Sequence, residues 1–162
     1  MKIRRNRCLL GAPPARSKTV VDVPERQSRA FFGRRKGHKL RPHQARLVAT
    51  LLPRLAIDLS RPAPADLGQL FAEPVTDVHL EIGFGGGEAM IAQAQRQPRA
   101  GFIGVEPFVN GMAKALAAIE AADLRNIRLH FDDAVSLIGW LPEKSLARID
   151  LVHPDPWPKR RH

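Results

Sequence analysis

The chain has 162 residues, of which 44% are hydrophobic, and it carries a formal net charge of +10. This length suits one ordinary domain, and no apolar run approaches the roughly 18 residues of a membrane-spanning helix, so we expect no membrane insertion and a cytoplasmic location. The single cysteine cannot form an internal disulfide, and the six histidines show no metal-ligand spacing, so we also expect no metal site.

The charge is unevenly divided along the chain. Residues 1–61 carry 16 Lys and Arg against three Asp and Glu, whereas residues 62–157 carry seven against 13. A basic segment ahead of an acidic body is typical of a protein that binds a polyanion, although basic tails are also common as simply solvated segments. The charge distribution therefore favours a nucleic-acid partner.

The first 74 residues divide into two parts. Residues 1–30 mix Arg, Pro and Ser with little apolar periodicity, which predicts a flexible basic segment. Residues 31–74 combine a basic arm, an amphipathic helix from Pro42 to about Leu55, and a Pro-rich connector. The candidate RNA contacts in the arm are Arg34, Arg35 and Lys36.

Strand and helix patterns alternate from residue 75 onward. The predicted strands cover residues 77–84, 100–106, 126–131 and 147–155, and the predicted helices cover residues 87–97, 107–124 and 132–141. The strands are apolar throughout rather than alternating, which is typical of a parallel sheet buried on both faces. The sequence therefore predicts a doubly wound, Rossmann-like α/β fold with right-handed crossovers.

An acid stands at the end of each predicted strand. These acids are Glu81, Glu106, the pair Asp132 and Asp133, and Asp155. An open α/β sheet binds its ligand beyond the carboxyl ends of its strands, so we expect these side chains to share one site. The turn at residues 83–88 has Glu88 where a dinucleotide fingerprint has its last glycine, and a carboxylate there would repel a pyrophosphate. S-adenosylmethionine, which has positive centres and no phosphate, fits this turn better.

Each acid has a cofactor role and a simpler structural one. Glu106 lies about 20 residues past the turn, where it can accept both ribose hydroxyls of an adenosine or complement the dipole of the next helix. Asp133 can reach the adenine amino group while Asp132 caps the following helix, and the choice between the two aspartates stays open. The candidate cofactor contacts are Glu81, Gly83, Gly85, Glu106, Asp133 and Asp155.

Four segments closely resemble the bacterial tRNA (guanine-N7)-methyltransferases, a family of class I S-adenosylmethionine-dependent enzymes. They are LEIGFGGGE (80–88), GVEPF (104–108), DDAV (132–135) and PDPWPKRRH (154–162). The resemblance implies that residues 75–162 are the N-terminal part of the methyltransferase domain and that the product is 7-methylguanosine in the variable loop of tRNA. It also implies a catalytic role for Asp155 and a tRNA contact for Lys159.

The chemistry of guanine agrees with this resemblance. Guanine N7 is a lone-pair acceptor that can attack a methyl group without first losing a proton, so the site must position the base rather than deprotonate it. Asp155 can orient the base, and Trp157 offers a stacking face for an extruded guanine or, equally, a hydrophobic lid. Lys159, Arg160 and Arg161 would neutralise phosphates or form a solvated basic tail.

Only about four of the family's seven strands are predicted here. We therefore expect a truncated chain with an unpaired sheet edge, a tendency to associate, an undetermined oligomeric state and little activity alone. Two alternatives stay open: another class I nucleic-acid methyltransferase, and a non-catalytic RNA-binding remnant.

Overall fold

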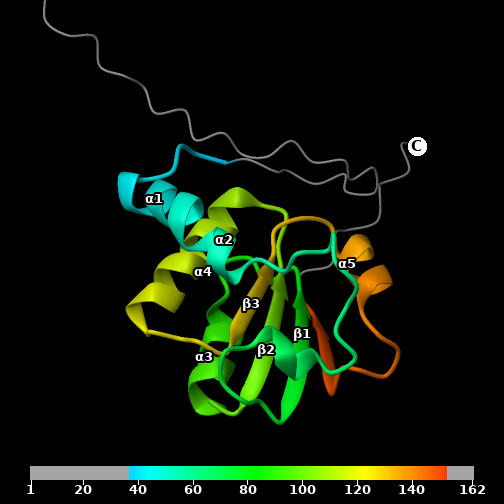
Figure 1. Cartoon of the computed structure of the whole chain (residues 1–162). Helices are drawn as coiled ribbons and strands as arrows, with labels where there is room; N and C mark the ends of the chain where they lie inside the picture. The colour runs from blue at the N-terminus through cyan, green and yellow to red at the C-terminus, as the bar shows by residue number, and fades with distance from the viewer. Residues whose placement is uncertain (1–36, 153–162) are drawn as a thin grey trace, which may run out of the picture.

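The computed structural model describes residues 37–152, and strands and helices alternate in it from residue 77 as predicted (Figure 1). In chain order the elements are α1 (Pro42–Thr50), α2 (Leu52–Leu55), the 3-10 helix η1 (Leu67–Leu70), β1 (Asp77–Ile82), α3 (Glu88–Arg96), β2 (Ala100–Val105), α4 (Val109–Ala121), β3 (Ile127–His130), α5 (Ala134–Trp140) and β4 (Arg148–Leu151). No helix in this part of the chain is long and apolar enough to cross a bilayer.

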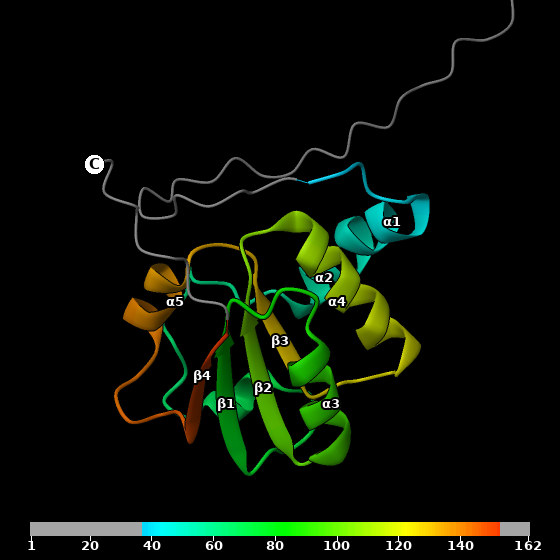
Figure 2. The same ribbon diagram turned by 180° about the vertical axis from the view of Figure 1, so that it is seen from behind.

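The four strands form one parallel sheet in the order β3-β2-β1-β4. The chain first builds outward from β1 to β3, with α3 and α4 on one face of the sheet (Figure 2). It then crosses to the other edge of β1, and α5 covers the opposite face. Strand order therefore reverses between β1 and β4, and the doubly wound prediction is confirmed.

Each face of the sheet has its own hydrophobic core. The buried stripe predicted for the helix after β2 is confirmed in α4, where Val109, Met112, Ala113 and Leu116 are all buried. The last three of these join the core on the first face. On the second face, Leu137 of α5 is fully buried against β1 and β2. All six residues of β2 are buried, which is the reason that this strand is apolar throughout.

The helix predicted from Pro42 to about Leu55 is two helices, α1 and α2, that meet at Leu51. Pro53 has no N–H to donate to the preceding turn, and this interrupts the helical ladder. The buried residues follow the predicted spacing, because Leu47, Val48, Leu52 and Leu55 all join the first core. The predicted spacing of buried residues is therefore confirmed, and the break between the two helices is a local effect of the proline.

The Pro-rich connector is more than a link between two segments. Asp66 caps η1 by accepting a hydrogen bond from the backbone N–H of Gly68 at 2.8 Å, and Leu67 and Phe71 are buried in the second core. Ile57 donates its backbone N–H to the carbonyl of Leu129 at 3.0 Å, beside the outer edge of β3. The connector therefore covers part of the sheet.

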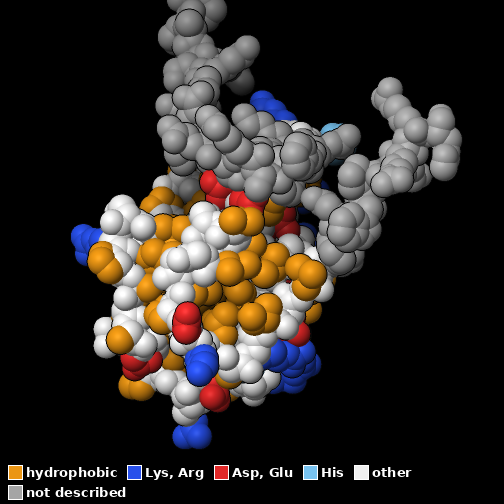
Figure 3. Space-filling model, turned by 90° about the vertical axis from the view of Figure 1, so that its right-hand side faces the viewer, with side chains coloured by type: hydrophobic (Ala, Val, Ile, Leu, Met, Phe, Trp, Pro, Cys, Tyr) orange, Lys and Arg blue, Asp and Glu red, His pale blue; other side chains and the backbone are white. Residues whose placement is uncertain are grey.

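The other edge of the sheet is open within the described residues. β4 pairs with β1 alone among the described strands, and apolar side chains lie exposed on it and on α5 (Figure 3). These side chains are Val135, Ile138, Ile149 and Leu151, with exposed fractions of 52 to 66%. Within the described residues, the predicted unpaired sheet edge is therefore present, and it carries exposed apolar side chains.

Candidate functional site

The glycine turn lies between β1 and α3, at the point where strand order reverses. Gly83, Gly85 and Gly87 all adopt positive φ angles, of 71°, 59° and 78°. A Cβ at Gly83 would lie 2.6 Å from the carbonyl oxygen of Val152, directly after β4, so a larger residue cannot stand there. A Cβ at Gly85 would meet no atom within 4 Å. The turn therefore leaves open space at Gly85 while its base is tightly packed.

Glu106 holds this turn against the start of α4. The residue is 7% exposed. One carboxylate oxygen accepts the N–H of Gly85 at 2.7 Å, and the other accepts the N–H of Phe108 at 2.8 Å. The role predicted for Glu106 at the ribose stays a prediction, and the structure adds that Glu106 orders the turn.

Gly111 is a site residue that the sequence analysis missed. It lies inside α4, and a Cβ there would come within 2.4 Å of the carbonyl oxygen of Gly85 and 3.4 Å of the Glu106 side chain. The backbone of the turn therefore rests directly on the backbone of α4. The sequence does carry a signal for this contact, because Gly111 lies within an alanine-rich helix. Glycine is unfavourable inside a helix unless close packing requires it.

Glu81 is buried beneath the turn, in β1. The residue is 4% exposed, and Oε1 of its carboxylate has no hydrogen-bond partner among the described residues. Burial raises the pKa of this carboxyl, the charge of Asp150 on β4 raises it further, and Arg148 acts in the opposite direction. A buried carboxylate without a partner is a strong attractor for a cation, so this position suits the positive centre of a ligand.

The structure shows which of the two aspartates after β3 caps α5, and the adenine contact stays a prediction for both. Asp133 is the N-cap of α5, and its Oδ1 accepts the N–H of Val135 at 2.7 Å. Asp132 Oδ1 instead accepts the N–H of Asp133 at 2.9 Å. The expectation that Asp132 caps the helix is therefore wrong, because the extended backbone at Asp133 aims its own side chain at the first turn.

Glu88 stands at the first position of α3, next to the turn, as the sequence indicated. It forms an ion pair with Lys114 of α4. The pair places a carboxylate at the helix N-terminus, where a phosphate-binding turn would have none.

The remaining predicted site residues lie outside the described residues. They are Asp155, Trp157, Lys159, Arg160 and Arg161 after β4, and Arg34, Arg35 and Lys36 in the basic arm. Within residues 37–152, no group of His, Cys, Asp and Glu side chains could hold a metal ion.

A doubly wound parallel sheet, with a glycine turn and buried acids where strand order reverses, defines the Rossmann-like class of α/β proteins. Residues 75–162 match the model of a family described as "Putative methyltransferase". The chain belongs to the bacterial tRNA (guanine-N7)-methyltransferase family, as the four sequence segments indicated.

Two curated relatives illustrate the similarity, and both are described as tRNA (guanine-N(7)-)-methyltransferase. One, from Rhodopseudomonas palustris strain BisB18, is 67% identical over 140 residues, covering 86% of this chain and 55% of the relative. Another, from Nitrobacter hamburgensis, is 62% identical over 133 residues, covering 82% and 52%. A solved structure of a 16S rRNA methyltransferase aligns with 58% of this chain and 44% of its own, at 22% identity and a TM-score of 0.44. The chain spans about half the length of these two curated relatives.

Proposed function

We propose that the protein transfers a methyl group from S-adenosylmethionine to N7 of a variable-loop guanine in tRNA. Membership of the family supports this reaction. The observation that carries the cofactor assignment is Oε1 of Glu81, which is buried next to the glycine turn and has no hydrogen-bond partner within residues 37–152. We expect the activity in the cytoplasm, where tRNA is the available substrate.

The residues around the turn fit the proposed cofactor. S-adenosylmethionine supplies an electrophilic methyl group on a positively charged sulfur, and its amino group is also cationic. The carboxylate of Glu81 would be stabilised by such a charge, because its burial disfavours the ionised form in the absence of a partner. Gly85 leaves room for close approach of a ligand to the backbone.

Two further acids would hold the adenosine. Glu106 would accept the ribose hydroxyls with its carboxylate oxygens, which lie beside the glycine turn. The adenine amino group would be accepted by Asp132 or Asp133. Since Oδ1 of Asp133 is engaged in capping α5, we retain both aspartates as candidates.

The guanine side of the reaction is assigned from the sequence alone. Asp155 would hold the base in line with the methyl group, with no need to remove a proton from N7. Trp157 would stack on the extruded base. The phosphates of the tRNA would be neutralised by the basic side chains of Lys159, Arg160, Arg161, Arg34, Arg35 and Lys36.

Calorimetric titration with S-adenosylmethionine, followed by nucleoside analysis of tRNA incubated with the protein, tests the proposal. We expect saturable cofactor binding that Glu81→Gln weakens at least tenfold, and 7-methylguanosine as the product. Asp155→Asn should keep cofactor binding and lose methyl transfer. Retained tRNA binding with no cofactor binding would instead favour a non-catalytic RNA-binding protein, and a different methylated nucleoside would favour another class I methyltransferase.

A further inference from the structure

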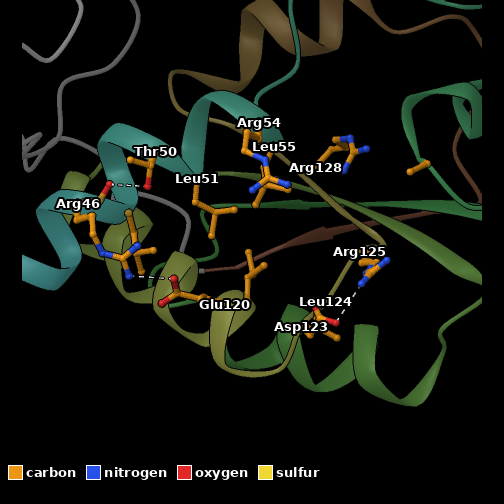
Figure 4. A pocket seen from close by; sticks show the side chains of 13 residues that line it. Arg46, Thr50, Leu51, Arg54, Leu55, Glu120, Asp123, Leu124, Arg125 and Arg128 are labelled. Carbon is orange, nitrogen blue, oxygen red and sulfur yellow. Dashed lines mark hydrogen bonds and ion pairs between the residues drawn. The ribbon is translucent and has the colours of Figure 1, made fainter.

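A groove with a volume of about 560 Å³ lies between α1, α2, the end of α4 and the start of β3. Its floor is apolar, and its rim carries four arginines from two separate stretches of the chain (Figure 4). The floor includes Leu47, Leu51, Leu55, Ile119 and Leu124, and the rim arginines are Arg46, Arg54, Arg125 and Arg128. We call this feature the arginine groove.

Arg54 is available to bind an anion. It is exposed in α2, and within residues 37–152 no hydrogen bond or ion pair to its side chain is present. Arg125 pairs with Asp123 at 3.3 Å and with Glu73 at 3.9 Å, but all three side chains are at least 66% exposed. Such exposed pairs are weak, so a phosphate can replace the carboxylate partners of Arg125.

Arg128 gives the groove a fixed wall. Its Nε donates to the carbonyl of Leu70 at 2.5 Å, its Nη1 donates to the carbonyl of Ile127 at 2.9 Å, and its guanidinium lies 5.4 Å from the ring centre of Phe71. The orientation of this cation is therefore set before any ligand arrives. A planar guanidinium held in this way is well suited to phosphate oxygens.

A basic segment connects the arginine groove with the glycine turn. The side chain of Asn110, near the start of α4, accepts the N–H of Gly37 at 2.8 Å and donates to the carbonyl of His38 at 2.7 Å. At the far end of α4, Glu120 contacts His43 at 2.7 Å and Arg46 at 3.0 Å.

Residues 38–43 therefore pass along α4 from the end beside the turn to the end beside the groove. Asn110 and Glu120 are ten residues apart, which is about 15 Å along a helix. Lys39 and Arg41 lie on this path and extend the positive charge between the two sites.

Among residues 37–152, the arginine groove is more positively charged than the ends of the strands. The groove has four arginines and two acids, Glu120 and Asp123. The strand-end region instead gathers carboxylates, which are Glu81, Glu106, Asp132, Asp133 and Asp150. Repulsion by these carboxylates would direct an approaching phosphate backbone toward the arginine groove.

We propose that the arginine groove binds the ribose-phosphate backbone of the tRNA, at the end of α4 that is farther from the glycine turn. Arg54 and Arg125 would each pair with a phosphate, and Arg128 would orient the strand between them. The identity of the RNA as tRNA rests on the proposed function, whereas the phosphate chemistry of the groove does not. The groove would act as an anchor that fixes the distance between the RNA body and the reacting base.

Anisotropy of a labelled, unmodified tRNA over a series of NaCl concentrations tests this assignment with Arg54→Gln. Arg96→Gln is the matched control, because Arg96 is also exposed in the last turn of a helix and forms no hydrogen bond or ion pair among the described residues. Loss of one phosphate contact should reduce the slope of log K against log salt by about 0.7–0.9 and weaken binding about fivefold at low salt. The control should change neither quantity, and Arg54→Glu should weaken binding further than Arg54→Gln.

Equal slopes and affinities for Arg54→Gln and Arg96→Gln would overturn the proposal, as would a chain that binds no tRNA at low salt. If Arg54→Gln weakens the binding of poly-glutamate but not the binding of tRNA, the groove binds an acidic protein segment, and the proposal is overturned too. Cofactor titration of Arg54→Gln should match that of the unchanged chain. Failure of the groove assignment is therefore distinguishable from failure of the proposed methyl transfer.

Discussion

Replacement of Gly111 by alanine tests whether the glycine turn is held by direct backbone contact with α4. The new Cβ would lie 2.4 Å from the carbonyl oxygen of Gly85, whereas real Cβ contacts stay above 3.0 Å, so the turn must move by about 0.6 Å or more. The turn resists this movement, because Gly85 also donates its N–H to buried Glu106. Overpacking of this kind costs about 1–3 kcal/mol.

Alanine is also a better helix former than glycine by about 1 kcal/mol, so the clash must be separated from this gain. Gly139→Ala is the control, because Gly139 lies within α5 and a Cβ there meets no atom within 4 Å. Urea unfolding should show Gly139→Ala stabilised by about 1 kcal/mol and Gly111→Ala less stable than this control by about 1–3 kcal/mol. Cofactor affinity should fall about tenfold in Gly111→Ala alone. If both variants are equally stabilised, the turn does not rest on α4 as described.

Four further outcomes are expected. Burial raises the pKa of Glu81, so the folded chain binds this proton more tightly than the unfolded chain does. Stability is therefore lost as the pH rises from the ordinary glutamate range through the raised pKa. In thermal melts, Glu81→Gln should not show this loss. Asn126→Ala should lower the free energy of unfolding by about 1–3 kcal/mol in urea, because the buried amide donates to three backbone carbonyls at 2.9–3.2 Å, and an unchanged value would mean that water replaces it. Asp133→Ala should reduce stability by about 1 kcal/mol through loss of the cap, whereas Asp132→Ala should leave the melting temperature nearly unchanged; the reverse order would contradict the observed capping. Ile149→Lys should reduce concentration-dependent light scattering without reducing stability, and unchanged scattering would show that association does not use the exposed edge of β4.

The pattern of apolar residues along the sequence is sufficient to predict the order of the helices and strands and the parallel sheet. Strands buried on both faces require continuous apolar runs, and helices that cover one face require a stripe of apolar residues such as that of α4. The burial of each element can therefore be predicted from its own sequence. The acids at the ends of β1, β2 and β3 were found for the same reason, since parallel strands bring their carboxyl ends to one edge. Family membership followed from short segments in a fixed order.

Individual side-chain contacts could not be predicted from the sequence and are known only from the tertiary structure. Whether Asp132 or Asp133 caps α5 depends on the backbone angles of two adjacent residues with the same side chain, which composition and spacing do not encode. The partners of Glu106 depend on how closely the glycine turn approaches α4. The arginine groove joins side chains that are as much as 82 positions apart, from Arg46 to Arg128, so no local pattern indicates it.

The sequence by itself therefore determined the fold class, the edge of the sheet at which the acids gather, and the family, because each of these is expressed through periodicity or through short contiguous motifs. Only the tertiary structure decided that Gly111 supports the turn, that Oε1 of Glu81 is buried without a partner within the described chain, and that four arginines surround one groove. These features depend on differences in packing distance of less than 1 Å or on the meeting of remote segments, and both arise from the folded arrangement as a whole.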